Sequence, residues 1–352
     1  MIRRLCNTKM KTIKKKFLKI LIISSVAFIY NEFLVYYLVL VQCDYPPVTD
    51  SSSQTSVMVL ADTHLLGSRL GHWADKLRRE WQMYRTFQTA ISLFKPKHVF
   101  FLGDLFDEGK WCPPDEFDYY VSRFRSLFSV DTSETRVHVM AGNHDIGFHY
   151  AVTPYLDTRF RDAFQTESVE LKILENKVPV VIINSVAFEG DSCFLCSDAA
   201  KKLDKVKKKL KKLKQRPILM SHYPLYRVSD EQCDKAHRDV DDAPEDEKRT
   251  LFREGWDCLT QNASKLLLNE LKPLSILSGH THYGCHMYHD TVIEISVSSF
   301  SWRNQKNPTF LLGHFSPTSL PRLTKCYMPK ENTVFTVYVF FASFLIFSLF
   351  IK

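Results

Sequence analysis

The 352-residue sequence lacks several features that would define simple classes of protein. It contains no internal repeat, so repeat architectures find no support. No acidic residue precedes Glu32, and no charged residue lies in 334–351. The first apolar run also lacks a convincing small-x-small cleavage site, which argues against a signal peptide that is removed. The absence of charge and of a cleavage site therefore indicates apolar segments that are retained at both ends.

These two apolar runs have the length of membrane-spanning helices. Residues 17–42 and 334–351 each come close to or exceed the roughly 20 residues that cross a bilayer. We therefore predict a transmembrane helix in each. Glu32 lies near the middle of the first run, where a carboxylate is costly unless it is paired. Two interpretations remain open, a paired Glu32 or one that snorkels or is protonated near the interface.

Basic residues before the first run predict its orientation. Seven lysines and arginines lie there, with Lys19 just inside the run and no acid among them, and the positive-inside rule makes the tail 1–16 cytosolic. A linker 43–55 and a lumenal or extracellular domain 56–330 then follow. The tail together with Lys19 accounts for the whole net charge of +8, because Glu32 and Lys352 cancel. The excess of basic residues therefore reflects topology and gives no support for nucleic-acid binding.

Cysteines in the predicted lumenal part favour disulfides. All but Cys6 lie there, an even number in an oxidising compartment, although spacing does not assign pairs. The charge-rich segment 229–259 resembles a surface excursion or lid, and a disulfide between Cys233 and Cys258 is our hypothesis for closing it. The eight cysteines concerned are Cys43, Cys112, Cys193, Cys196, Cys233, Cys258, Cys285 and Cys326.

Two short motifs agree with this placement. Cys193-x-x-Cys196 has no thioredoxin-like pattern around it, so a local disulfide or pairing elsewhere is favoured over a redox pair. The sequon at Asn262 predicts glycosylation on the lumenal side.

The domain itself reads as alternating strands and helices. Continuous Val- and Ile-rich runs suit strands buried on both faces. Helices are expected at 73–94 and at 197–215, and the many lysines of the second are interpreted as a solvated face rather than a lipid- or phosphate-binding patch. The expected strands are 56–61, 98–103, 136–141, 178–185, 216–221, 274–279, 291–299 and 309–315.

Metal-ligand residue types follow five of these strands. Because open α/β sheets place their sites at the carboxyl ends of strands, we expect these side chains to share one cleft. Residues two apart, as in D-x-H and H-x-H, form plausible local chelates. The residues in chain order are Asp62 and His64, then Asp104, then Asn143, His144 and Asp145, then His222, and finally His280 and His282.

The order D-x-H, G-D, G-N-H-D, H, G-H-x-H resembles the calcineurin-like metallophosphoesterase superfamily over residues 56–315. The resemblance implies an α/β fold, a β-sandwich flanked by helices with a dinuclear metal site at strand carboxyl ends. It also implies that Asp104 bridges two divalent ions, which clamp a phosphoryl group and activate a water. Manganese is expected, with iron or zinc as alternatives. One ion would be held by Asp62, His64, Asp104 and His282, and the other by Asp104, Asn143, His222 and His280.

The resemblance gives catalytic roles to two further residues. His144 would contact the phosphate and protonate the leaving oxygen, and Asp145 would orient its imidazole. For Asp107 and Glu108, support of the ligands or loop capping is at least as favoured as catalysis. His286 has no place in the ligand set and is expected to line a loop or meet substrate, and Cys285 beside it is a disulfide candidate.

A narrower resemblance within the family comes from "FLGDLFDEGKW", "MAGNHDIGFHY" and an anchor at each end. It implies a multi-pass membrane phosphodiesterase of the early secretory pathway. Such enzymes remove ethanolamine phosphate from GPI-anchor glycans and so promote ER-to-Golgi transport, with GPI-anchored proteins as substrates and cargo-transport machinery as partners. The chain departs from relatives with a lysine-rich retrieval signal by ending in "FIK". A secretory phosphomonoesterase or nucleotide phosphatase, and a non-catalytic GPI-cargo receptor, remain alternatives.

Overall fold

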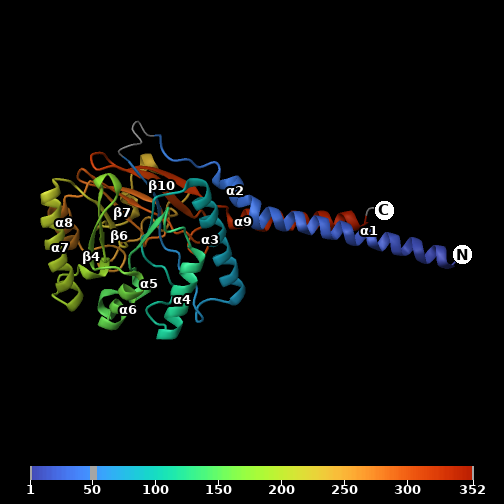
Figure 1. Cartoon of the computed structure of the whole chain (residues 1–352), viewed down its shortest axis with the longest axis horizontal. Coiled ribbons are helices and arrows are strands. Elements are labelled where there is room, and N and C mark those ends of the chain that lie inside the picture. Colours follow the sequence, from blue (N-terminus) through green and yellow to red (C-terminus); the bar gives the residue numbers. More distant parts are fainter. Residues whose placement is uncertain (1, 48–53, 351–352) are drawn as a thin grey trace.

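The computed structural model describes residues 2–47 and 54–350, so residues 48–53 of the expected linker and Ile351 of the second apolar run lie outside it. Figure 1 shows a layered domain from which two helices project side by side. The first is formed by α1 (Ile2–Ile29), a π-helical turn (Tyr30–Leu34) and α2 (Val35–Leu40), and the second is α9 (Glu331–Phe350). Segments Ile13–Leu40 and Glu331–Phe350 are long and apolar enough to cross a membrane.

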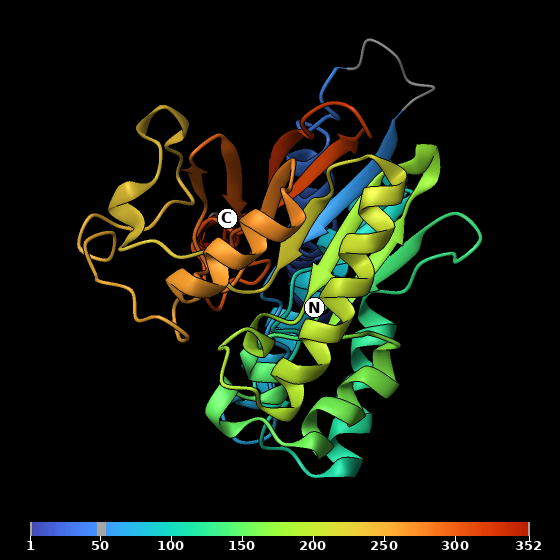
Figure 2. The same ribbon diagram turned by 90° about the vertical axis from the view of Figure 1, so that its left-hand side faces the viewer.

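Two sheets form the centre of the domain, which confirms the expected α/β sandwich (Figure 2). One sheet has the order β11-β10-β1-β2-β3 and the other β4-β5-β6-β7-β9-β8. Strands β1, β2 and β3 are parallel, as are β5, β6, β7 and β9, while β10, β11, β4 and β8 pair antiparallel. The strands are β1 (Thr55–Leu60), β2 (His98–Phe101), β3 (Arg136–Val139), β4 (Val169–Ile173), β5 (Pro179–Ile183), β6 (Ile218–Ser221), β7 (Ser275–Ser278), β8 (Cys285–His289), β9 (Val292–Ser296), β10 (Thr309–Phe315) and β11 (Arg322–Tyr327).

Side-chain alternation divides the core into two layers. In β1, Val57 and Val59 face the other sheet, whereas Met58 and Leu60 face the outer helices, because successive side chains of a strand point to opposite faces. Both layers are apolar, which explains why the strands read as continuous hydrophobic runs. All eight expected strands form, with ends shifted by a few residues; β4, β8 and β11 are additional.

Helices cover the outer faces of both sheets. The expected helices form as α3 (Trp73–Phe94) and α7 (Phe194–Leu213). Leu203, Val206 and Leu210 of α7 are buried, and most of its lysines are exposed, as expected for a solvated basic face. The remaining α-helices, for which no range was predicted, are α4 (Pro114–Leu127), α5 (Asn143–Ile146), α6 (Pro154–Phe164) and α8 (Gln261–Leu271).

The base of the two projecting helices packs against the domain. Glu32, in the π-helical turn, accepts hydrogen bonds from Arg78 of α3 at 3.0 and 3.2 Å and from the Tyr338 hydroxyl of α9 at 2.5 Å. Glu32 is therefore paired, which decides between the two interpretations left open by the sequence. Nearby, a disulfide joins Cys43 to Cys326 of β11. We define the neck as the contact of residues 30–40 and α9 with α3.

Candidate metal centre and active site

The predicted ligands converge at one edge of the sandwich. They follow β1, β2, β6 and β7, and Asn143 begins α5 directly after β3. The Asp104 carboxylate lies at the centre, with its Oδ2 at 3.5 Å from His64 Nε2 and 3.3 Å from His222 Nε2. Three overlapping groups of potential metal-binding atoms lie here, formed by Asp62, His64 and His282, by Asp104, His222 and His280, and by His64, Asp104 and His144. The first two groups correspond to the two half-sites that the resemblance implied.

Five of the seven ligands have left-handed backbone conformations. Such conformations are uncommon for residues other than glycine and cost of order 1–3 kcal/mol each, so they persist where the surroundings impose them. Gly103 has φ of +88°, and a Cβ there would lie 2.7 Å from His222 Nδ1. Sharp turns at the strand ends thus bring the side chains into the cleft. The five ligands, with φ between 43° and 74°, are Asp62, His64, Asp104, His280 and His282.

Backbone carbonyls determine the tautomers of two of the histidines. His222 Nδ1 donates to the carbonyl oxygen of Leu102 at 2.7 Å, and His280 Nε2 donates to that of Trp256 at 2.6 Å. A carbonyl oxygen only accepts, so in the neutral rings the other nitrogens, His222 Nε2 and His280 Nδ1, carry the lone pairs. These nitrogens face each other at 3.2 Å. Although burial acts to lower it, the Asp104 carboxylate raises the pKa of His222 to about 9, so a proton on Nε2 relieves the repulsion between the facing nitrogens, and a divalent ion would take the place of this proton.

The second half-site, formed by Asp62, His64 and His282, also brings imidazole nitrogens close to each other. His64 Nε2 faces His282 Nε2 at 3.1 Å, while His64 Nδ1 lies 3.3 Å from the Asp107 carboxylate. Asp62 accepts the backbone N–H of His280 through Oδ2 at 2.9 Å. Its other oxygen, Oδ1, is buried without a hydrogen-bond partner among the described residues. An orphaned buried carboxylate oxygen beside two imidazole nitrogens suits a metal ion.

The two carboxylates of the cluster differ electrostatically. Burial raises the pKa of Asp62 to about 7, although nearby imidazoles oppose this effect. Burial also acts to raise the pKa of Asp104, but the His222 and His144 imidazoles hold it well below its usual range. Desolvation lowers the pKa of His280 to about 3 and that of His282 well below its usual range. Asp104 is thus anionic, and His280 and His282 are neutral, the state in which imidazole binds metals.

The environment of His144 corrects one expectation. His144 Nδ1 donates to the carbonyl oxygen of Asp107 at 2.9 Å, and its backbone N–H donates to Asp104 Oδ1 at 2.7 Å. The Asp145 carboxylate instead accepts the backbone N–H groups of Phe106 and Gly142. Asp145 therefore holds the loop and not the imidazole, because its position at the start of α5 directs it to free backbone donors. The ring nitrogen of His144 left for a substrate is Nε2.

Residues near the ligands include some that the sequence did not single out. Arg303 Nη2 lies 3.1 Å from Asp107 Oδ2, and the carbonyl of Trp256 orients His280. Neither Arg303 nor Trp256 belongs to a recognisable motif, so no sequence pattern pointed to them. Asp107 supports His64 and His144, and Glu108 caps the backbone of Arg69 and Leu70, which agrees with the favoured supporting roles.

The excursion 229–259 borders the metal cluster. A cavity of about 520 Å³ lies between it and the strand-end loop, with lining residues that include Glu247, Arg253, His280 and Tyr283. The proposed Cys233–Cys258 disulfide is wrong: Cys233 is bonded to Cys285 of β8. Spacing within the excursion suggested a local loop, but the excursion folds back onto β8 and brings the more distant cysteine into reach.

His286 and the remaining cysteines lie outside the set of seven proposed ligands. His286 stacks on His237 with ring centroids 4.5 Å apart, so it lines the excursion, outside the seven-ligand set. Cys112, Cys193, Cys196 and Cys258 are free, which limits the expected disulfides to two among the described residues.

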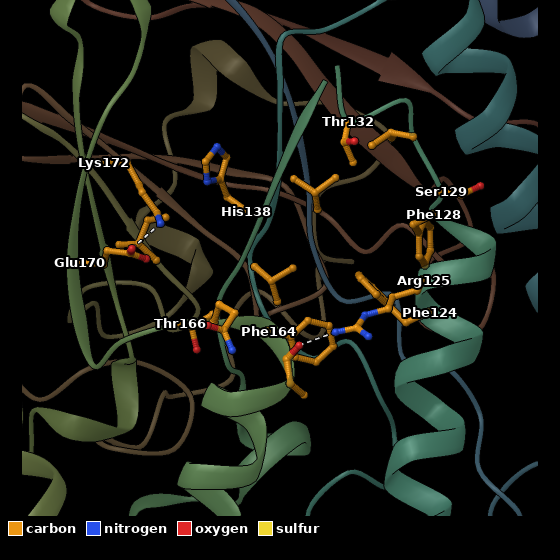
Figure 3. A pocket seen from close by; sticks show the side chains of 16 residues that line it. Phe124, Arg125, Phe128, Ser129, Thr132, His138, Phe164, Thr166, Glu170 and Lys172 are labelled. Atoms are coloured by element: carbon orange, nitrogen blue, oxygen red, sulfur yellow. Dashed lines mark hydrogen bonds and ion pairs between the residues drawn. The ribbon is translucent and has the colours of Figure 1, made fainter. Parts of the chain in front are cut away.

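A second cavity, of about 410 Å³, lies away from the cluster. It is bounded by α4, β3, α6 and β4, and its wall includes Phe124, Phe128, His138, Phe164 and Lys172 (Figure 3). None of the seven predicted ligands lines it. We therefore assign the candidate active site to the cavity beside His280.

Comparisons with known proteins agree with this geometry. The family model for calcineurin-like phosphoesterases matches residues 55–284. The chain belongs to this family. It is 45% identical to Metallophosphoesterase 1 of Xenopus laevis, covering 88% of this chain and 83% of that protein. Metallophosphoesterase 1 of Danio rerio is 44% identical over 88% of this chain and 85% of its own, and that of Pongo abelii is 41% identical over 95% and 89%.

Family membership settles the reaction class. The chain is a metal-dependent phosphoester hydrolase, and its fold implies a dinuclear site for divalent metals. Two such ions, when bound, polarise phosphoryl oxygens and activate the attacking water. The non-catalytic cargo receptor is therefore no longer a leading alternative.

Proposed function

We propose that this phosphoesterase is a lumenal phosphodiesterase of the early secretory pathway that removes ethanolamine phosphate from GPI-anchor glycans. Its action would promote ER-to-Golgi transport of GPI-anchored proteins, which are its substrates, with cargo-transport machinery as possible further partners. The similarity to Metallophosphoesterase 1 over most of the chain supports this function. The observation that carries it is the acid-bearing cavity that directly adjoins the proposed metal cluster.

This cavity suits the two ends of an ethanolamine phosphate group. His280, a proposed metal ligand, lies in its wall, and the Glu247 carboxylate lies in the same wall. Asp230 and Asp257, which also line it, are paired with Arg227 and Arg253. Glu247 is thus the carboxylate that we assign to the ethanolamine ammonium group, while the phosphate occupies the metal centre.

The proposed roles at the centre follow from the contacts. Asp62, His64 and His282 would hold one ion, and Asn143, His222 and His280 would hold the other, with Asp104 available to both. His144, whose Nδ1 is occupied by the Asp107 carbonyl, presents Nε2 to the leaving oxygen. We expect manganese as the native metal, because mixed imidazole and carboxylate ligands accommodate it.

The two apolar helices support the proposed orientation. The acid-free basic tail would remain cytosolic, and the domain between the helices would be lumenal. Asn262 is exposed near the start of α8 and is available for glycosylation there. A mobility shift on enzymatic deglycosylation, absent in Asn262→Gln, tests this orientation.

Product analysis tests the substrate. Purified full-length protein in detergent with Mn²⁺ should release ethanolamine phosphate from a GPI glycan, and Asp104→Asn should not. Hydrolysis confined to nucleotides or phosphoproteins would favour the phosphomonoesterase alternative. If Asp104→Asn restored GPI-protein transport fully in cells that lack the protein, a receptor function would replace the enzymatic one.

A further inference from the structure

A second cluster of metal-binding residue types lies outside the catalytic centre. His149, Asp191, Cys193 and Cys196 each offer an atom within 4.8 Å of the others. His149 belongs to a 3₁₀ turn (His149–Ala151) after α5, and the other three residues lie at or just before the start of α7. The cluster therefore joins two segments that are separated by more than forty positions in the chain.

The hydrogen bonds of His149 indicate that a cation belongs in this cluster. His149 Nδ1 donates to the carbonyl oxygen of Val186 at 2.8 Å, so the neutral ring carries a lone pair on Nε2. That nitrogen faces Asp191 Oδ2 at 2.8 Å. A lone pair facing a carboxylate is repulsive, and either a proton or a metal ion on Nε2 removes the repulsion.

The two thiols favour the metal ion. Asp191 Oδ1 accepts hydrogen bonds from the backbone N–H of Cys193 at 3.0 Å and from the Cys196 thiol at 3.3 Å. Cys193 is the N-cap of α7, and its sulfur accepts the backbone N–H of Cys196 at 3.1 Å. A Cys-x-x-Cys pair with one imidazole and one carboxylate makes a four-ligand set of the kind that zinc prefers.

We propose that His149, Asp191, Cys193 and Cys196 bind a structural zinc ion. The four residues would supply all four ligands of a tetrahedral zinc ion, as in closed structural sites, so no coordination position would be left for catalysis. Burial raises the pKa of the Cys196 thiol to about 12, so zinc binding has to release its proton. The site is therefore expected to empty as the pH falls, when protons compete for the thiolates and the imidazole.

The zinc site would stabilise one rim of the catalytic cleft. Phe148, which precedes His149, stacks on Trp256 with ring centroids 4.7 Å apart. The carbonyl of Trp256 in turn accepts the hydrogen bond from His280. Anchoring His149 to α7 thus restrains a chain of contacts that ends at a proposed catalytic ligand. Loss of the zinc ion should lower the melting temperature of the protein. It should raise KM by a few-fold and lower kcat by a smaller factor.

Metal analysis of the full-length protein in detergent tests the proposal. After purification from medium with manganese and zinc, mass spectrometry of the metals should find one zinc ion fewer per chain in Cys193→Ser/Cys196→Ser than in wild type. The other metal ions should remain. Cys112→Ser removes a buried free thiol outside the cluster and serves as the matched control, which should keep the wild-type zinc content.

Two results would overturn the zinc site. One is equal zinc content in wild type and the double variant; the other is a Cys193–Cys196 disulfide in the isolated protein, detected as a peptide lighter by two hydrogens. If the double variant does not fold, His149→Gln gives the same readout without altering a thiol, and unchanged zinc there counts against the site. The result is independent of the GPI substrate, because zinc content is measured without any turnover.

Discussion

Two buried carboxylates, one at the catalytic edge and one in the neck, have different partners. Asp104 lies at the catalytic edge among imidazoles whose ring nitrogens converge on it. Glu32 lies in the neck, where the Arg78 guanidinium and the Tyr338 hydroxyl donate to it. Glu32 has its countercharge within the protein, whereas Asp104 and its neighbours have more acceptors than donors. The Glu32 arrangement stabilises the structure, whereas the Asp104 arrangement creates a site for metal ions.

The comparison also separates the two regions by backbone geometry. The catalytic edge depends on left-handed turns at ligands such as Asp104 and His280, and such strain requires a rigid scaffold. The neck instead contains a π-helical turn at Tyr30–Leu34, which interrupts a helix that otherwise runs from residue 2 to residue 40. This turn carries Glu32, and Arg78 also stacks on Trp302 at 4.7 Å from the ring centroid. Local distortion thus serves metal binding at one end and docking of the apolar helices at the other.

The largest expected effect comes from Asp104→Asn. The amide keeps the size of the side chain but removes the negative charge between the two half-sites, so both metal content and activity should fall. We expect kcat/KM for a generic phosphodiester to fall by at least about 10³-fold. Metal analysis and hydrolysis of a chromogenic phosphodiester measure the two quantities. Retention of full activity would show that Asp104 does not bridge the ions.

A smaller loss is expected for His144→Asn. This residue contacts no proposed ligand atom through its Nδ1, so metal content should remain while kcat falls by about 10²–10⁴-fold. The loss should shrink for substrates with good leaving groups, because these need no proton. An equal loss across leaving groups would contradict the assigned proton transfer.

At the neck, Glu32→Gln should affect stability and not catalysis. Weakening the bonds to Arg78 and Tyr338 should cost about 1–3 kcal/mol, since hydrogen bonds to charged groups have this size. Thermal unfolding of the detergent-purified protein should shift downward, with kcat/KM within about twofold of wild type, because Glu32 bonds to Arg78 and Tyr338 and to no proposed ligand. A large loss of activity without a change in stability would mean that the neck and the catalytic edge are coupled.

The smallest effect is expected for Glu247→Gln. If this carboxylate receives the ethanolamine ammonium, KM for the GPI glycan should rise by roughly 3–10-fold, the range for one exposed to half-buried ion pair. The KM for a phosphodiester without a positive charge should not change. A parallel rise for both substrates would remove Glu247 from substrate recognition.

Much of the fold and of the catalytic edge could be predicted from local sequence. Val- and Ile-rich runs marked eight strands, because strands buried on both faces need apolar residues at every position. The ligand types behind five of them marked the edge, because parallel strands bring their carboxyl ends together. Strand β4, by contrast, has mixed polarity, and β8 carries two histidines, so neither resembled a buried strand.

Partners that come from distant segments could not be predicted. Cys233 reaches Cys285 and not Cys258, and the Trp256 carbonyl orients His280, although nothing in either stretch specifies the contact. Asp145 shares a motif with His144 but turns to the backbone of Phe106 and Gly142. These outcomes depend on how the excursion and the loops pack, which is a property of the whole chain.

The sequence by itself determined the reaction class, the ligand types and the two apolar ends, because these depend on residue identity and on periodicities along one strand or helix. The tertiary structure decided which nitrogen of His222 and of His280 carries the lone pair, how Glu32 is neutralised, and where His149 meets the thiols of α7. Each of these depends on a donor or acceptor from a remote segment. Short-range forces between atoms select such partners only after folding has brought the segments within a few ångströms.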